Sequence, residues 1–202
     1  MSASYDPFLL LNLPRRPLVD MDQLDQNFRR LAAVYHPDKS DSSTDATKPF
    51  AAEGDFEDKF LQLQEAATLL RNLSTRLRYL GDNSSETSHS FPLEAADFFS
   101  LVNATLRQAH DLTSRYHATQ GTLAKALLMQ ELLLSKQELE KTQRLLDSWQ
   151  ESLNTQLREL DEQWPNVDNS KLLDLATSFS FASRWDQQLK DALLNNKTVF
   201  SS

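Results

Sequence analysis

The stretch Phe28-Arg29-Arg30-Leu31-Ala32-Ala33-Val34-Tyr35-His36-Pro37-Asp38-Lys39 contains the change of local structure on which the fold of this chain depends. Its first eight residues continue a helical pattern of apolar side chains that recur three or four positions apart, at Leu24, Phe28, Leu31, Ala32 and Tyr35. Pro37 ends this helix, because the residue before a proline is pushed out of the helical region. The sequence therefore predicts an amphipathic helix followed directly by a polar loop.

The start of this helix is marked by Asp20, a favoured N-cap residue, with Gln23 three positions later in a capping-box pattern. Before it, residues 5–14 read as a short helical turn that stops ahead of Pro14. A brief loop between Pro14 and Pro17 separates the two helical elements.

Downstream, residues 40–54 have the Ser-, Asp- and Thr-rich composition of a loop. A second amphipathic helix follows, with apolar residues at Phe56, Phe60, Leu63, Ala67 and Leu70. The loop is only about fifteen residues long, so the two helices are expected to run antiparallel and to close their apolar faces on each other. A last short helix is expected from Ser74 to Leu80.

This order of elements resembles the J-domain over about residues 5 to 80. The resemblance rests on the triplet His36-Pro37-Asp38 at the join of the two helices, and on Gln64-Glu65-Ala66-Ala67 and Arg76 to Leu80 in the helices that follow. It implies that His36, Pro37 and Asp38 contact a DnaK-type heat-shock chaperone, and that Asp38 engages one of its arginines. It also implies that Arg29, Arg30 and Lys39 supply a positive docking surface.

The triplet suits recognition physically, since proline fixes one φ angle and a carboxylate can pair with an arginine through two parallel hydrogen bonds. For Arg29 and Arg30 the alternative is an ordinary solvated helix face. The chaperone would carry out the ATP hydrolysis, so no catalytic residue is expected in this chain.

Residues 81–91 have the composition of a linker, which divides the chain into a J-domain at 1–80 and a second part at 92–202. Three helices are expected in the second part: one carrying Phe98 to Leu106, one from Thr122 to about Trp164 with a near-heptad apolar period, and one from Ser170 to about Asn195. The predicted fold is all-α, a J-domain followed by a three-helix, coiled-coil-like bundle.

This arrangement, together with the opening Phe8-Leu9-Leu10-Leu11-Asn12-Leu13-Pro14, resembles HscB-type co-chaperones of iron–sulfur cluster assembly. The resemblance implies that the bundle binds the cluster scaffold protein IscU as client and that the J-domain addresses an HscA-type chaperone. Client-binding candidates are Phe98, Phe99, Leu101, Val102 and Phe181, for which the alternative is ordinary bundle core. Ser100 departs from the apolar residue of the family, and the middle helix is longer than the family's.

Composition narrows the function further. A net charge of −8 without a basic stripe argues against binding to nucleic acid and to an anionic membrane surface. The chain has no cysteine and only four histidines without metal-ligand spacing, so neither a metal site nor a cofactor is expected. No nucleophile motif or phosphate-binding loop indicates an enzyme. No signal peptide or apolar span is recognised, which predicts a cytoplasmic protein.

The sequence thus predicts an HscB-type co-chaperone that stimulates a DnaK/HscA-type ATPase and delivers IscU to it. Two alternatives stay open: a J-protein with a different client, and a J-protein whose bundle is a dimerising coiled coil. The HscB-type co-chaperone and the J-protein with a different client both allow a monomer or a weak dimer.

Overall fold

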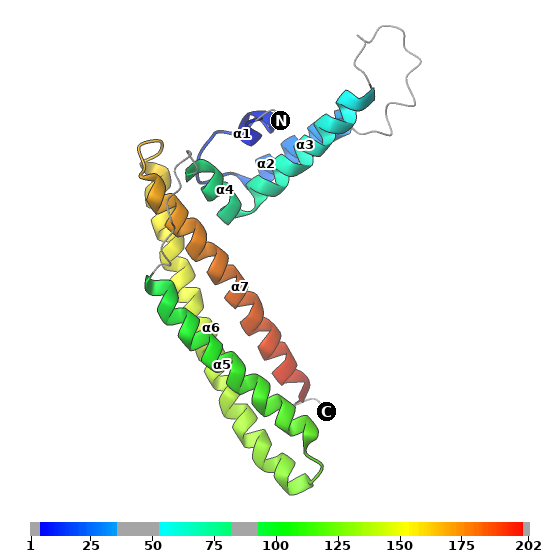
Figure 1. Cartoon of the computed structure of the whole chain (residues 1–202), viewed down its shortest axis with the longest axis vertical. Helices are drawn as coiled ribbons and strands as arrows, with labels where there is room; N and C mark the ends of the chain where they lie inside the picture. Colours follow the sequence, from blue (N-terminus) through cyan, green and yellow to red (C-terminus); the bar gives the residue numbers. More distant parts are fainter. Residues whose placement is uncertain (1–4, 36–52, 82–92, 200–202) are drawn as a thin grey trace. The chain divides into compact units, whose positions relative to one another are not determined.

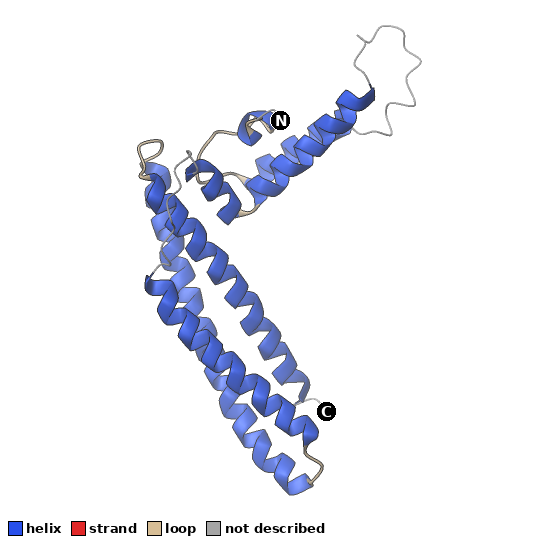
Figure 2. Cartoon of the chain, viewed as in Figure 1, coloured by secondary structure: helices blue, strands red, loops and turns tan. Residues whose placement is uncertain are grey.

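The computed structural model describes residues 5–35, 53–81 and 93–199, which form helices and no strand (Figures 1 and 2). The helices are α1 (Pro7–Leu10), α2 (Met21–Tyr35), α3 (Glu53–Arg71), α4 (Leu73–Gly81), α5 (Leu93–Ala118), α6 (Thr122–Glu162) and α7 (Asn169–Val199). The all-α prediction is confirmed. Within these ranges no helix is both long enough and apolar enough to cross a lipid bilayer.

The chain divides into two compact units. The first consists of Met1–Ser85 with Leu157–Ala176, and the second of Glu86–Gln156 with Thr177–Ser202, so α6 and α7 contribute to both. Of the expected linker at 81–91 only Gly81 is described, and it is the last residue of α4. The predicted division of function at this linker therefore stays a prediction.

Side-chain caps define the helix starts in the first unit. Asp6 caps α1 by accepting a hydrogen bond from the Phe8 amide at 2.9 Å. Asp20 caps α2 as predicted, because its carboxylate accepts from the amides of Asp22 and Gln23 at 2.9 and 3.1 Å. Each cap satisfies N–H groups that have no partner within the helix.

The core of the first unit lies where α1, α3 and α4 meet the start of α2. Its largest fully buried side chains are Phe8, Leu11, Leu24, Leu63, Leu70 and Leu77. Leu63, Ala67 and Leu70 belong to the predicted apolar face of α3, and all three are buried. On the predicted apolar face of α2 only Leu24 is buried. The other predicted members of this core that are described are half-buried: Phe28, Leu31, Ala32, Tyr35 and, on α3, Phe60. Burying one such leucine stabilises the fold by about 1.5–3 kcal/mol, so this cluster is its main source of stability.

The same unit includes the last turn of α6, through Asp161. This buried carboxylate accepts hydrogen bonds from Nε and Nη2 of Arg16 and, at 2.9 Å, from the amide of Leu18. Arg76 of α4 is buried beside it and donates to the carbonyl oxygens of Pro17 and Leu70. Burial lowers the pKa of Arg76 to about 10, while the negative charge of Asp161 acts in the opposite direction.

In the second unit α5, α6 and α7 run side by side (Figure 1), and hydrogen bonds join α6 to both neighbours. The hydroxyls of Thr105 on α5 and Thr142 on α6 lie 3.3 Å apart, and the Gln143 amide donates to Asp186 of α7 at 2.8 Å. Buried residues on α6 follow a 4-3 spacing, at Leu128, Leu132, Ser135, Leu139, Thr142, Leu146, Trp149 and Leu153. The coiled-coil period expected for the middle helix is therefore confirmed.

Candidate functional site

Helices α2 and α3 form an antiparallel hairpin whose register is set by contacts at both ends. Where α3 ends, Arg71 pairs with Asp25 at 2.9 Å and lies over the ring of Phe28 at 4.9 Å. Near the other end, the Lys59 ammonium lies 5.8 Å from the centre of the Tyr35 ring. Each cation thus bridges the start of one helix to the end of the other.

The predicted recognition triplet follows this hairpin directly in the sequence. α2 ends at Tyr35, and His36, Pro37, Asp38 and Lys39 are the next residues; all four lie outside the described residues. Their assignment to chaperone binding stays a prediction. The described Arg29 and Arg30 are exposed on α2, as a docking role requires.

The N-terminal segment is fixed against the side of α3 and α4. The Tyr5 hydroxyl donates to Glu65 of α3 at 2.9 Å, and the rings of Phe8 and Tyr79 lie 6.0 Å apart. Burial, helped by the Glu65 carboxylate, raises the pKa of Tyr5 to about 12. Arg15 pairs with Asp6 at 3.1 Å and stacks over Tyr79, so the residues before α2 are tied to α3 and α4 at several points.

In the second unit, the predicted client-binding residues lie around a row of four aromatic rings. Phe98 stacks on Trp149 with ring centres 4.9 Å apart, Trp149 lies 5.9 Å from Trp185, and Phe181 stacks on Trp185 at 5.4 Å. Phe98 and Phe181 belong to α5 and α7, which the row connects through α6. Helical periodicity alone does not predict that Trp149 and Trp185 link the two phenylalanines, because the contacts join residues of different helices.

The five client-binding candidates differ in exposure. Phe99 is 52% exposed and Leu101 39% exposed, while Phe98 and Phe181 are half-buried. Val102 is fully buried, so its side chain packs in the bundle core and not on the surface. Phe98, Leu101 and Val102 share one face of α5, because residues three and four positions apart in a helix are neighbours. Phe99 lies about 100° from Phe98 around the helix, and about 160° from Leu101. The five candidates therefore do not form one exposed surface, and their role in client binding stays a prediction.

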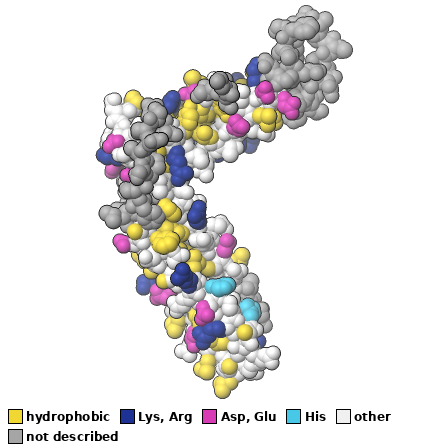
Figure 3. Space-filling model, viewed as in Figure 1, with side chains coloured by type: hydrophobic (Ala, Val, Ile, Leu, Met, Phe, Trp, Pro, Cys, Tyr) yellow, Lys and Arg dark blue, Asp and Glu magenta, His cyan; other side chains and the backbone are white. Residues whose placement is uncertain are grey.

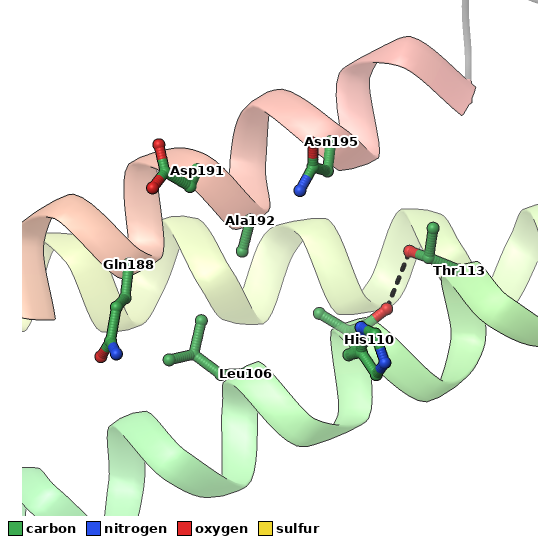
Figure 4. A pocket seen from close by; sticks show the side chains of 8 residues that line it. Leu106, His110, Thr113, Gln188, Asp191, Ala192 and Asn195 are labelled. Atoms are coloured by element: carbon green, nitrogen blue, oxygen red, sulfur yellow. Dashed lines mark hydrogen bonds between the residues drawn. The ribbon is translucent and has the colours of Figure 1, made fainter.

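A separate open cleft of about 300 Å³ lies between α5 and α7 (Figure 4). Its lining is Leu106, Ala109, His110 and Thr113 from α5, and Gln188, Asp191, Ala192 and Asn195 from α7. The Thr113 hydroxyl donates to the Ala109 carbonyl at 2.8 Å, as Figure 4 shows. None of the predicted site residues lines this cleft. Among the described residues, no three His, Cys, Asp or Glu side chains are grouped so as to hold a metal ion.

The arrangement of helices is that of the HscB-type co-chaperones. The human co-chaperone protein HscB matches with a TM-score of 0.62 and 13% sequence identity, over 94% of this chain and 83% of that one. The chaperone HscB from Vibrio cholerae matches with a TM-score of 0.54 and 16% identity, over 94% of this chain and 99% of that one. No family model and no curated protein sequence matches the chain. The HscB-type fold predicted from the sequence is thereby confirmed.

Proposed function

We propose that this protein is an HscB-type co-chaperone of the cytoplasm, which stimulates ATP hydrolysis by a DnaK/HscA-type chaperone and delivers the scaffold protein IscU to it. The observation that carries the proposal is the sequence His36-Pro37-Asp38 directly after α2 in a chain with the HscB fold. Residues 1–80 would address the chaperone, and residues 92–202 would hold the client.

On this proposal the chain is not itself an enzyme. Asp38 pairs with an arginine of the chaperone, and Pro37 restricts the backbone beside it. Arg29, Arg30 and Lys39 attract the acidic face of the chaperone and speed the encounter. Binding to one conformational state of the chaperone shifts its equilibrium toward that state, which is how a protein without catalytic groups accelerates hydrolysis by another.

Client binding is assigned to the exposed Phe99 together with the accessible parts of Phe98 and Phe181. Phe99 precedes Leu106 by seven residues and shares its α7-facing side of α5, whereas Leu101 points away from that side. Exposed aromatic and aliphatic side chains on neighbouring helices are typical of a protein-binding patch. The stacks on Trp149 and Trp185 hold Phe98 and Phe181 in place, so little side-chain freedom is lost when a client binds.

The chaperone-directed half is tested by single-turnover ATP hydrolysis with a DnaK/HscA-type chaperone. Asp38→Asn is expected to reduce the rate to that of the chaperone alone while leaving the helical circular dichroism unchanged. Asp41→Asn, the same change three residues later, is the matched control and should stimulate like the parent chain. Full stimulation by Asp38→Asn would contradict the proposal.

The client-directed half is tested by titrating IscU into the chain and its variants. Phe99→Ala is expected to weaken binding about fivefold or more, because truncating a central aromatic anchor costs more than about 1 kcal/mol in typical interfaces, at about 1.4 kcal/mol per tenfold. Leu194→Ala, at a leucine of α7 that is 62% exposed, is the control and should bind normally. No binding of IscU by the parent chain would favour a J-protein with a different client.

A further inference from the structure

The long helix α6 exposes more leucine than a bundle helix needs. Leu123, Leu127, Leu133, Leu134 and Leu145 are 78%, 62%, 48%, 58% and 45% exposed. At about 100° per residue, Leu123, Leu127, Leu134 and Leu145 fall within about 40° of one another around the helix and form a single stripe. In Figure 3 hydrophobic side chains gather at the lower end of the bundle, where α5 and α6 join.

Within this stripe four residues are spaced symmetrically about one point, with opposite charges at the two inner positions. Leu134 and Glu138 are four positions apart, as are Lys141 and Leu145, and Lys141 is three positions after Glu138. Glu138 and Lys141 lie 3.5 Å apart and are 55% and 63% exposed. A twofold axis between residues 139 and 140 exchanges the two leucines and exchanges the acid with the base.

We propose that this stripe of α6 is the contact surface for a second copy of the chain, paired antiparallel about that axis. Leu134 of one protomer then lies against Leu145 of the other, and Glu138 of one protomer lies beside Lys141 of the other. In a twofold interface the same patch serves on both sides, so it must be complementary to itself. The spacing of the four residues meets this condition for the antiparallel orientation.

The charges disfavour a parallel pairing of the two helices. A parallel pair of α6 helices places Glu138 against Glu138 and Lys141 against Lys141, and like charges directly opposite each other are destabilising. The antiparallel pair has two favourable contacts of opposite charge in place of the two repulsive ones. Self-complementary charge also favours a second copy over an unrelated partner as the occupant of the stripe.

The contact is small, so the dimer is reversible. A single helical stripe on each protomer lies at the low end of specific interfaces, where dissociation constants on the order of micromolar are usual. The inference does not depend on the proposed co-chaperone function, because neither the residues nor the measurement involves a chaperone or a client.

Charge variants test the pairing by sedimentation equilibrium of the full chain. Glu138→Lys and Lys141→Glu are each expected to weaken association at least tenfold, since each creates two like-charge contacts. An equal mixture of the two variants should associate like the parent chain, because the heterodimer brings two lysines against two glutamates. Glu140→Lys makes the same charge change off the stripe, where Glu140 pairs with Lys136 at 3.7 Å, and should leave association unchanged.

Cysteine variants test the orientation, and the chain offers a clean background because it contains no cysteine. An equal mixture of Leu134→Cys and Leu145→Cys is expected to form disulfide-linked dimers on oxidation. Either variant alone should not, because equivalent residues lie about 16 Å apart along the paired helices and a disulfide needs Cα atoms within about 7 Å.

Three results would overturn the inference. The first is a parent chain that stays monomeric at concentrations well above micromolar. The second is a Glu138→Lys variant that associates as strongly as the parent while the mixture gains nothing. The third is self-linking of Leu134→Cys in preference to the mixture, which would mean a parallel contact.

Discussion

Arg16 and Asp161 are 145 residues apart in the sequence, yet the Arg16 guanidinium donates to both carboxylate oxygens of Asp161. The Leu18 amide donates to the same carboxylate, and the buried guanidinium of Arg76 is close enough to feel its charge. A segment from the start of the chain and the last turn of α6 are thereby held in one compact unit. Asp161 is the common acceptor of these contacts.

Asp161→Asn should lower the free energy of unfolding by about 2 kcal/mol, since hydrogen bonds to a charged group contribute about 1.5–3 kcal/mol and an amide cannot accept from all these donors. Urea denaturation followed by circular dichroism measures the change. Asp25→Asn breaks the exposed pair with Arg71 and should cost less than about 1 kcal/mol. Equal losses in the two variants would mean that the buried position of Asp161 contributes nothing.

Gly81→Ala should destabilise the first unit by about 1 kcal/mol, although alanine normally favours a helix. A Cβ at Gly81 would meet the Leu173 side chain at 3.0 Å and the Asn169 carbonyl oxygen at 3.2 Å. At Gly121 the nearest atom is 3.9 Å away, so Gly121→Ala is the control and should change stability by less than about 0.5 kcal/mol. If the Gly81→Ala variant has a melting temperature equal to or above that of the parent chain, Leu173 and Asn169 can move aside without a cost in stability.

The Tyr5 hydroxyl should lose its proton at a higher pH than an ordinary tyrosine. Its pKa is raised from 10 to about 12 by burial and by Glu65, so the folded state favours the neutral phenol. The stabilisation from this phenol is fully present below pH 10 and is lost as the pH rises through about 12. The absorbance of tyrosinate against pH should therefore show a late component that Tyr5→Phe removes.

Two further variants identify the source of that late component. Glu65→Gln removes the negative neighbour and should shift the component to lower pH. Tyr116→Phe, on α5, should leave it in place. A late component that persists undiminished in Tyr5→Phe would assign it to another tyrosine, and Tyr79 is then the candidate, because burial raises its pKa as well.

The exposed arginines of α2 should act on the rate of chaperone binding. Replacing Arg29 and Arg30 by glutamate is expected to slow association about tenfold at low salt, with the difference shrinking as salt is added, because steering between exposed charges is screened. Stopped-flow association with the chaperone measures this effect. Arg107→Glu with Arg144→Glu, two exposed positions on the bundle, gives the same charge change as a control. A salt-independent loss would indicate a direct contact instead.

Much of the fold could be predicted from interactions between residues close together in the sequence. Asp20 caps α2 as its residue type and spacing predict, and the 4-3 period of α6 is buried as expected. These features depend on interactions within a few residues, which the sequence contains directly. The recognition triplet His36-Pro37-Asp38 was also visible in the sequence, and it lies outside the described residues.

The sequence by itself determined the helices, their amphipathic faces and the resemblance to a J-domain followed by a bundle. Only the tertiary structure decided that Arg16 meets Asp161, that Trp149 and Trp185 join Phe98 to Phe181, and that Val102 is buried while Phe99 is exposed. Helical periodicity identifies an apolar face but not the neighbour that covers it. In a three-helix bundle that neighbour depends on packing between residues far apart in the chain, which no local pattern records.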